Sequence, residues 1–547
     1  MAQPHIENKN VIPGTVHLVD LQGKMQTAHA EGKQHDVVLV PKPSGDPDDP
    51  LNWSPRRKML STSCMCMYTL MVGIASAAIY SILVPISEDT GLTLGDLNAG
   101  TGYMFLFFGW GCLVWQPLAL QYGKRPVYLF STLATMAMMI WAPYTKSNGQ
   151  WIANKILQGF FGAPIESLCE VSVTDIYFTH ERGAYIGLYA FMLAGSNFLA
   201  PVLAGFINDG QDWKWVLYWC AIFCGVAFVY LFFFLEETNY DRKPLAVEVS
   251  DTPLESSDES IESQTAPTTT EEKTPRENPP ADVDYEAGEV YKKKSYLDKL
   301  RLLDRPRPFK VFQMMWRPLS LFSFPIVVYS GFAYGSNLVW FNVLNGTSSL
   351  ILGSAPYNFS SSMVGLSYVS AIIGVGLSSL FSGKFGDWLM IRLARRKKGI
   401  HESEHRLWLF AINILLTPFA LILWGVGAAH GVHWFGLIFG MGVLAFTITI
   451  GIQASVSYCV DTYKDLSGEA LVTVIIIRNT MSFAVGYGIT PWVTNMGYQN
   501  AFLVAAFVGL AQALTFLIFV KWGKGWREMS KHRYWKYVEK SGHLGTH

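Results

Sequence analysis

The chain has 547 residues, of which 50% are hydrophobic and 15% are charged, and its mean hydropathy is +0.23. The 42 Lys and Arg residues balance the 42 Asp and Glu residues, so the net charge gives no indication of nucleic-acid binding. This apolar composition argues against a set of ordinary soluble domains and indicates an integral membrane protein.

Residues 1–58 are predicted to form a polar cytoplasmic tail. This tail contains no hydrophobic stretch followed by a cleavage site, so we expect no removable signal peptide, and the first membrane helix would direct insertion. The seven cysteines are scattered in apolar surroundings without adjacent histidines, and we expect buried free thiols rather than a metal or redox site. The sequence contains no Walker motif, catalytic triad or metal-ligand cluster, so we expect neither an enzyme nor a cofactor.

Two blocks of apolar runs follow the tail, at residues 59–240 and 316–522. A membrane-spanning helix needs about 20 predominantly apolar residues, and each block supplies six candidates. The predicted fold class is therefore an all-α integral membrane protein with twelve transmembrane helices in two six-helix halves. The predicted spans are residues 59–86, 100–120, 127–144, 151–176, 184–207, 216–235, 319–343, 363–381, 407–429, 434–458, 471–492 and 501–520.

Residues 241–315, between the halves, are predicted to form a disordered cytoplasmic linker with a basic end. The acidic part is rich in Ser, Thr and Pro and cannot bury enough apolar area to fold alone. The basic end, YKKKSYLDKLRLLDRPRPFK, would suit a helix or tether against the anionic inner leaflet. A flexible linker, at most regulated by phosphorylation, is the favoured alternative. Residues 523–547 are predicted to form a second cytoplasmic tail.

The distribution of Lys and Arg sets the predicted orientation, since cytoplasmic loops near membrane ends retain positive charge. We expect both termini in the cytoplasm and a multi-pass protein of the cell membrane, with the vacuolar membrane as the alternative. The sequons at Asn345 and Asn358 follow the seventh span, where the charges predict an external connection, so both are candidate glycosylation sites. The cations on the predicted cytoplasmic side are Arg56, Arg57, Lys58, Lys124, Arg125, Arg182, those of residues 392–398, Lys464 and those of residues 521–527.

A related motif ends the second span of each half. QPLALQYGKRPVYL carries Gly123, Lys124 and Arg125 after the second span, and GKFGDWLMIRLARRKKG carries Gly383 and Asp387 after the eighth. Related motifs at corresponding places indicate a duplicated six-helix unit.

With these motifs the sequence resembles the major facilitator superfamily, and within it the fungal drug:proton antiporter group with twelve spans. The family's loop motif, Gly-x-x-x-Asp-Arg-x-Gly-Arg-Arg, aligns with residues 116–125, where the final Gly-Lys-Arg matches in type. Leu120 replaces the aspartate of the motif and Gln121 replaces its first arginine. The stretches DWKWVLYW, LEETNYDR and ESEHRLWL also resemble this group, and the resemblance covers about residues 49–531.

Two further stretches resemble family motifs inside the spans. KILQGFFGA is similar to the fourth-helix motif Arg-x-x-x-Gly, with Lys155 in the arginine place and Gly159 intact. SNFLAPVLAGF is similar to the antiporter motif of the fifth helix, and Pro201 and Gly205 match it. The resemblance implies that Gly159, Pro201 and Gly205 serve helix packing.

The resemblance also implies a cytoplasmic gate, because the family's loop aspartate takes part in a charge network that holds the outward-open state. With Leu120 in that place, the N-terminal half must build such a network from other residues, whereas the C-terminal half keeps Asp387. We expect the gate to contain Lys124, Arg125, Asp175, Arg182, Gly383, Asp387 and Asp461.

The predicted fourth span carries three carboxylates, each of which is costly near the membrane centre. At about 100° per residue, its small and ionisable residues share one face, and Asp175 lies opposite Glu166. We expect Asp175 at the inner boundary, in an ion pair with Lys124, Arg125 or Arg182. The shared face holds Lys155, Gly159, Gly162, Ala163, Glu166 and Glu170.

Glu166 and Glu170 form the predicted proton site. Two carboxylates four residues apart repel when both are ionised, so one can take up a proton near neutral pH. A buried pair neutralised by a cation on another helix is the alternative. Arg478, deep in the eleventh span, requires a partner, which is either Asp461 or a carboxylate of the fourth span.

Other residues inside the spans complete the predicted proton and substrate site. Asn197, Asn337 and Trp340 are polar or aromatic groups for a substrate, and Trp340 would stack on an organic cation or else pack in the core. Lys155 lies ~16 Å from Glu166 along the helix. It either joins the site, snorkels, or pairs across helices.

The sequence therefore predicts a proton-coupled secondary transporter that exports a small organic molecule, such as a drug, toxin or secondary metabolite, by alternating access. Proton-coupled uptake or exchange of a cationic nutrient such as a polyamine is the alternative, and a non-transporting membrane sensor is a third. LEETNYDR stands where sugar porters carry a Pro-Glu-Ser-Pro-Arg type motif, which argues against a sugar porter. The expected partners are the substrate, protons and the lipid bilayer, without nucleic acid, and we expect a monomer.

Overall fold

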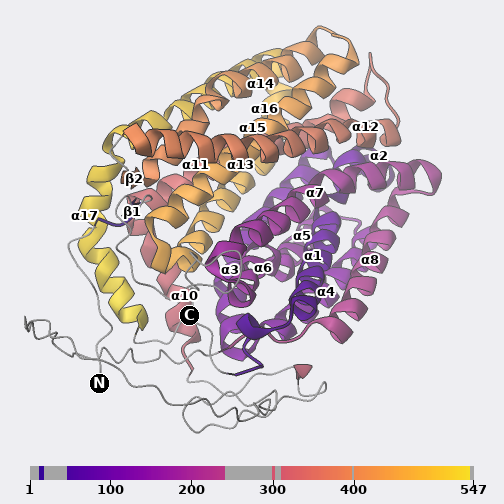
Figure 1. The fold of residues 1–547 in the computed structure, drawn as a ribbon. Coiled ribbons are helices and arrows are strands. Elements are labelled where there is room, and N and C mark those ends of the chain that lie inside the picture. The colour runs from indigo at the N-terminus through magenta and orange to yellow at the C-terminus, as the bar shows by residue number, and fades with distance from the viewer. Residues whose placement is uncertain (1–11, 18–45, 241–298, 302–308, 397–399, 543–547) are drawn as a thin grey trace, which may run out of the picture.

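The computed structural model of the chain describes residues 12–17, 46–240, 299–301, 309–396 and 400–542. Figure 1 shows two helical bundles, the N-terminal half in indigo to magenta and the C-terminal half in red-orange to yellow. Most of the predicted linker lies outside the described residues, so its disorder and its basic tether stay predictions.

The helices of the N-terminal half begin and end at residues with a local reason to do so. α3 begins at a capping box formed by Thr93 and Asp96, and it ends before Gly123, whose φ of 117° suits glycine. The elements, with 3-10 helices written η, are η1 Pro50–Asn52, α1 Pro55–Ala77, η2 Ala78–Ser81, α2 Leu83–Thr90, α3 Leu94–Tyr122, α4 Lys124–Trp141, η3 Ala142–Tyr144, α5 Asn148–Gly162, α6 Pro164–Ile176, α7 Thr179–Gly210 and α8 Trp213–Phe234.

The C-terminal half follows the same plan with longer helices. α11 begins with Pro325 in its first turn, where proline is preorganised for a helix. α16 bends at Gly497, whose φ of 72° separates the last two predicted spans. The elements are α10 Val311–Ser320, η4 Leu321–Ser323, α11 Pro325–Gly353, α12 Ser361–Ser367, α13 Val369–Arg396, η5 Ser403–Ala411, α14 Asn413–Ala429, α15 Trp434–Thr462, η6 Lys464–Leu466, α16 Ser467–Leu514 and α17 Phe516–Gly542.

The predicted runs are helical apart from local breaks. Within the described residues, nine helical segments are long and apolar enough to cross a membrane, or ten when α10 to η4 and α11 count as one bent span. The predicted fourth span is not among them because it is divided into α5 and α6, and the last segment, which covers α16 and α17, holds two predicted runs.

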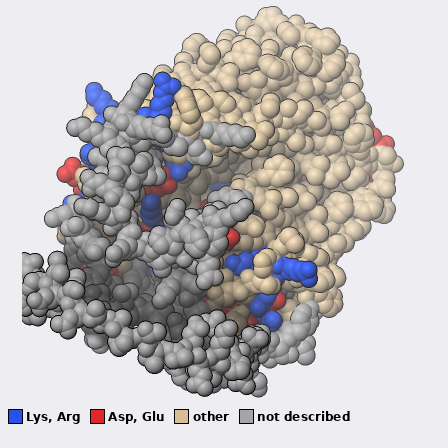
Figure 2. All heavy atoms as spheres, viewed as in Figure 1, with Lys and Arg blue, Asp and Glu red and all other residues tan. Residues whose placement is uncertain are grey.

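The molecular surface has the character expected of a protein surrounded by lipid. On the face in view in Figure 2, most atoms are tan, and the charged side chains gather toward the end where α10 and α17 lie. Large apolar side chains such as Val226, Leu377 and Phe507 are more than half exposed. An apolar surface of this extent marks a membrane contact rather than a surface in water.

A small sheet departs from the all-α prediction. β1 (Thr15–His17), in the N-terminal tail, pairs antiparallel with β2 (Ile400–Glu402), before η5, in the register Thr15 to Glu402. The pairing joins segments almost 400 residues apart, which local sequence patterns cannot indicate. It attaches the N-terminal tail to the C-terminal half.

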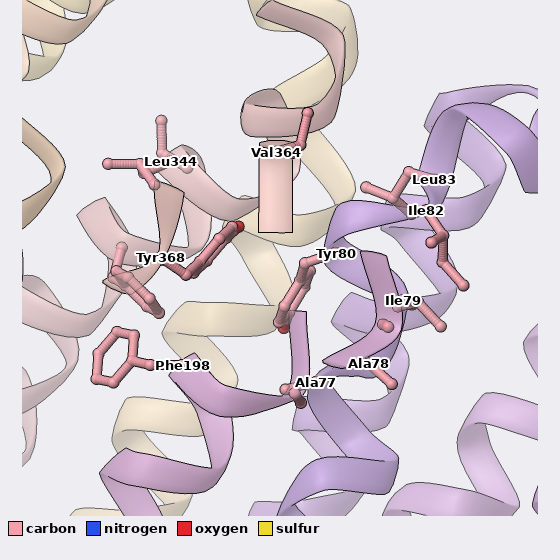
Figure 3. Packing of buried hydrophobic residues seen from close by; sticks show 14 of the residues in the cluster. Ala77, Ala78, Ile79, Tyr80, Ile82, Leu83, Phe198, Leu344, Val364 and Tyr368 are labelled. Carbon is pink, nitrogen blue, oxygen red and sulfur yellow. The ribbon is translucent and has the colours of Figure 1, made fainter. Parts of the chain in front are cut away.

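The two halves meet at the end where α1 and α11 terminate, which we call the far end; the opposite end, with α10 and α17, is the near end. Asn98 of α3 donates to Oγ1 of Thr490 on α16 at 3.1 Å. Apolar residues of both halves form one buried cluster there (Figure 3), including Ala77, Ala78, Ile79, Tyr80, Ile82, Leu83, Phe198, Leu344, Val364 and Tyr368.

Candidate functional site

A break in the predicted fourth span shapes the site. α5 ends at Gly162, and α6 begins at Pro164, which lacks the backbone N–H that a continuous helix would need. The small residues before the break pack tightly on α3: a Cβ at Gly159 would clash with the carbonyl oxygen of Met104, and one at Gly162 would lie 2.6 Å from Phe108. The predicted shared face is thus divided, and its glycines allow helix contact instead of lining a cavity.

Lys155, on α5, is fully buried inside the N-terminal half. Its Nζ donates to Oε1 of Gln158 at 2.8 Å and lies 4.7 Å from the ring centroid of Trp151. Among the described residues no carboxylate pairs with it. The structure therefore separates Lys155 from Glu166 and Glu170, and it neither snorkels to the surface nor pairs across helices.

Glu166 of α6 forms an ion pair with Arg478 of α16, and this pair joins the two halves. The two side chains are only 9% and 6% exposed. Nη1 of Arg478 also donates to the hydroxyl of Tyr334 on α11 at 3.1 Å, and its Cζ lies 4.6 Å from the centroid of that ring. The partner of Arg478 is thus the fourth-span carboxylate and not Asp461.

Glu170, one helical turn beyond Glu166, is half-buried. No residue in the described part of the chain forms a hydrogen bond or an ion pair with its carboxylate. It lies within electrostatic range of the hydroxyls of Tyr189 and Tyr334, which belong to opposite halves. The structure therefore presents one paired carboxylate and, one helical turn away, one carboxylate without a partner among the described residues.

The other predicted substrate residues are not brought to this cluster. Asn197 and Asn337 each donate to the backbone carbonyl four residues earlier on their own helix. Trp340 is buried, and its Nε1 donates to Oε1 of Gln512 on α16 at 3.0 Å. These contacts are those of packing residues, so the core alternative describes Trp340.

The near end of the N-terminal half holds a charge network. Lys124 pairs with Asp175, one of the predicted partners of this carboxylate. The carboxylate of Glu237, which follows α8, accepts the backbone N–H groups of Lys124 and Arg125 at 3.0 Å each. Burial raises the pKa of Glu237, and these N–H groups oppose that shift. Glu237 thus anchors the loop in which Leu120 replaces the family's aspartate.

Two arginines of the predicted gate cap helices instead of pairing with Asp175. Arg182 donates to the carbonyls of Thr174 and Tyr177 at the end of α6. Arg125 donates to the carbonyls of Phe232 and Leu235 at the end of α8. Cations at helix C-termini satisfy unpaired carbonyls and the helix dipole.

The C-terminal half has a different arrangement at the near end. Asp461 pairs with Arg406 of η5, and Arg527 of α17 donates to both carboxylate oxygens of Glu404. Gly383 and Asp387 lie on α13. The side chain of Asp387 lies outside the described residues, so its part in the gate stays a prediction.

The helix contact predicted for Pro201 and Gly205 is present where α7 meets α12. A Cβ at Gly205 would clash with the carbonyl oxygen of Ser361, and one at Gly365 would clash with that of Pro201. This contact belongs to the far end, where the halves are closed.

The two sequons lie in different environments. α11 extends to Gly353, ten residues beyond the predicted end of the seventh span, so Asn345 lies within the helix and is 1% exposed. Its side-chain oxygen accepts the hydroxyl of Tyr368 at 3.0 Å. Burial and this hydrogen bond argue against the predicted glycan at Asn345. Asn358 is exposed in the following loop and stays a predicted site.

The match to a family model decides the classification. The model of the Major Facilitator Superfamily matches residues 65–471. The chain belongs to this superfamily. Its members' fold is that of membrane transporters and not of enzymes.

Several superfamily proteins are similar over nearly the whole chain. The uncharacterized MFS-type transporter C1271.10c of Schizosaccharomyces pombe is 28% identical over 96% of this chain and 94% of its own. Protein HOL1 of Saccharomyces cerevisiae is 25% identical over 96% and 97%, and the MFS antiporter QDR3 of Candida albicans is 21% identical over 92% and 83%. The xylose transporter XylE from E. coli, in a partially occluded inward open conformation, has the same fold, with a TM-score of 0.55 and 11% identity over 85% of this chain and 98% of that one.

Sequence reasoning about this superfamily member missed three partners. The sequence predicts neither the contact of Tyr334 with Arg478 nor the roles of Glu237 and Arg406. Glu237 lies in LEETNYDR and Arg406 in ESEHRLWL, both of which were identified only as stretches that resemble the family. A charged residue directly beside a predicted membrane boundary is the signal that points to such anchors.

Proposed function

We propose that the chain is a proton-coupled secondary transporter that exports a small organic molecule by alternating access. The observation that carries this proposal is the buried Glu166–Arg478 ion pair between the two halves, with unpaired Glu170 one turn away. We also propose that the near end is cytoplasmic, that the protein is monomeric, and that it resides in the cell membrane.

The ion pair supplies a physical link between protonation and motion. Alternating access requires the halves to move relative to each other, and a buried pair resists this because separation leaves two uncompensated charges. A proton on Glu166 removes its charge and leaves Arg478 with Tyr334. The contact between α6 and α16 is then free to open.

The unpaired carboxylate suggests the class of substrate. Glu170 lies near Tyr189 and Tyr334, so negative charge and aromatic rings are available to one molecule. Organic cations are attracted by both features. We therefore propose a substrate that carries at least one positive charge.

Export is the proposed direction because one relative carries the name MFS antiporter. The same carboxylate and tyrosines would equally serve proton-coupled uptake or exchange of a cationic nutrient such as a polyamine. Both alternatives use the same site and differ in the direction of the substrate relative to the proton.

Purified protein provides the test. A thermal-shift screen against polyamines, cationic drugs and neutral metabolites should find cations that raise the melting temperature, because a ligand that binds the folded state stabilises it. Those cations are then loaded into proteoliposomes under an imposed pH gradient of either sign. Movement opposite to the proton supports export, and movement with it supports uptake. Binding without any movement at either gradient would overturn the transporter in favour of a sensor.

A further inference from the structure

α10 is oriented differently from the spanning helices. It precedes α11 with a bend of 89° at η4 and Pro325. α11 holds most of the predicted seventh span, and it is apolar enough to cross a membrane when α10 and η4 are counted with it. If α11 is the part that crosses, a helix at nearly a right angle to it runs along the membrane plane. α10 therefore lies at the level where the near end meets the surface of the bilayer.

One face of this segment is aromatic and uncovered. Phe312 and Trp316 are 73% and 70% exposed, and their spacing of four residues places them on the same side of α10. Phe309, just before the helix, is 62% exposed, and its ring centroid lies 5.7 Å from that of Phe312. Val311 and Arg317 on the other side are buried. A row of large aromatic rings with this exposure marks a surface that contacts an apolar partner, such as another protein or the bilayer.

We propose that the aromatic face of α10 inserts into the inner leaflet of the bilayer and that anionic headgroups hold it there. The inference rests on the proposed orientation, in which the near end is cytoplasmic. Lys310 immediately precedes the helix, and Lys299 and Arg301 lie ten or more residues earlier in the chain; these cations provide the positive charge that anionic lipids attract. Aromatic side chains beside cations are the composition of a helix that lies in the interface.

α10 is also attached to both halves of the protein. Arg317 pairs with Glu469 of α16 at 2.9 Å, and the hydroxyl of Thr473 donates to the carbonyl of Pro318 at 2.7 Å. On the other side, the backbone N–H of Lys310 donates to Oε1 of Gln121 on α3 at 3.3 Å.

The end of α10 lies where those two helices meet. Leu319 packs against a small buried apolar cluster. The cluster consists of Cys112 and Leu113 of α3, Val472, Ile475 and Ile476 of α16, and Ala163 at the α5–α6 break. The near ends of α3 and α16 cannot separate without disturbing α10. Binding of α10 to the leaflet therefore holds the near ends of α3 and α16 together, and anionic lipid strengthens this effect. We call this effect the clamp.

The depth of α10 tests the insertion directly. Nitroxide labels on Phe312→Cys and on the matched control Gln313→Cys are compared in nanodiscs that contain phosphatidylserine. Gln313 is exposed and lies at the flank of the aromatic face, about 100° from Phe312 and about 60° from Trp316. The label at 312 should collide mainly with oxygen, which concentrates among acyl chains, and the label at 313 mainly with an aqueous nickel chelate. Equal nickel accessibility at both positions, or dipolar broadening at 312 that shows a second copy on this face, would overturn the proposal.

The clamp is tested by the lipid dependence of transport. We expect the wild-type transport rate to change at least severalfold between vesicles with and without phosphatidylserine. The double variant Phe312→Asn with Trp316→Asn should lose that dependence, and Gln313→Ala should keep it. An unchanged lipid response in the double variant would contradict the clamp. The depth measurement does not depend on transport activity. It therefore still tests the insertion of α10 if the proposed transport function proves wrong.

Discussion

The charges of Glu166 and Arg478 are each tolerable at their depth only because the other is present. Removing one partner of a buried pair leaves an uncompensated charge, which typically costs about 3–5 kcal/mol. The hydroxyl of Tyr334 supplies one hydrogen bond to Arg478 and cannot replace a carboxylate. The pair is therefore a structural link as well as the proposed proton site.

Arg478→Met should strongly lower the stability of the protein, by about 3–5 kcal/mol. The double variant Glu166→Gln with Arg478→Met should be more stable than Arg478→Met alone, because no unpaired carboxylate is left. Thermal unfolding in detergent of the wild type, both single variants and the double variant gives the coupling energy. Simple additivity of the single effects would show that the two side chains do not interact.

Glu170→Gln should weaken substrate binding without lowering the stability of the protein. Glu170 has no partner among the described residues, so loss of its charge should not lower the melting temperature. The affinity for an organic cation should fall at least about tenfold, which corresponds to about 1.4 kcal/mol. Thermal shifts titrated with the best cation of the screen measure this. An unchanged dissociation constant would remove Glu170 from the substrate site.

At the scale of helices, the fourth span is divided into α5 and α6. The division separates packing within one half from contact with the other half, two roles that would share one face of a continuous helix. The glycine side of α5 packs on α3 inside one half, and α6 carries the carboxylates toward the other half. Pro164 could be identified in the sequence as a bend, but the partners on each side of it could not. They are set by long-range packing, which leaves no local pattern.

Gly159→Ala should destabilise the protein by about 1–3 kcal/mol, the usual cost of forcing a methyl group into a tight contact. The added Cβ would meet backbone atoms of Met104, which cannot rotate away. Gly149→Ala is the matched control on the same helix, since nothing lies within 4 Å of its Cβ position. Comparable melting temperatures for the two variants would contradict the close approach of α5 and α3.

The β1–β2 pairing makes a prediction for the N-terminal tail. Gly14 has a φ of 80° and lies against Ser403 and Thr462, so Gly14→Ala should release β1. Hydrogen exchange should then rise together at residues 15–17 and 400–402, without change in the spanning helices. Gly525→Ala, which meets nothing within 4 Å, is the control. Unchanged exchange in both segments would count against the pairing.

At the scale of the whole molecule, hydropathy predicts the fold well because the bilayer allows few solutions. Backbone groups in lipid must bond internally, so long apolar runs become helices and loops become polar. The same reasoning placed Asn345 outside the membrane, because it ended the seventh span where apolar residues become sparse. The structure continues α11 beyond that point, since polar side chains such as Asn345 are satisfied inside the protein.

Only one side of the candidate site, the carboxylate of Glu166, could be predicted from the sequence. A wheel of the fourth span identifies Glu166 and leaves a cation on another helix as one alternative, but Arg478 lies more than 300 residues away on the other half. Only the packing of the two halves selects that arginine over other partners. The same packing separates Glu166 from Lys155, although helical periodicity alone places them on one face.

The central claim is that Glu166 couples proton binding to movement of the halves. The most direct test is Glu166→Gln in proteoliposomes, with substrate identified by the thermal-shift screen. We predict that this variant keeps substrate counterflow, which needs no proton gradient, and loses accumulation driven by an imposed pH gradient. The surface variant Asp89→Asn removes the same charge from an exposed pair with Lys214 and should retain both activities. Accumulation by Glu166→Gln at the wild-type level across several pH values would contradict the account.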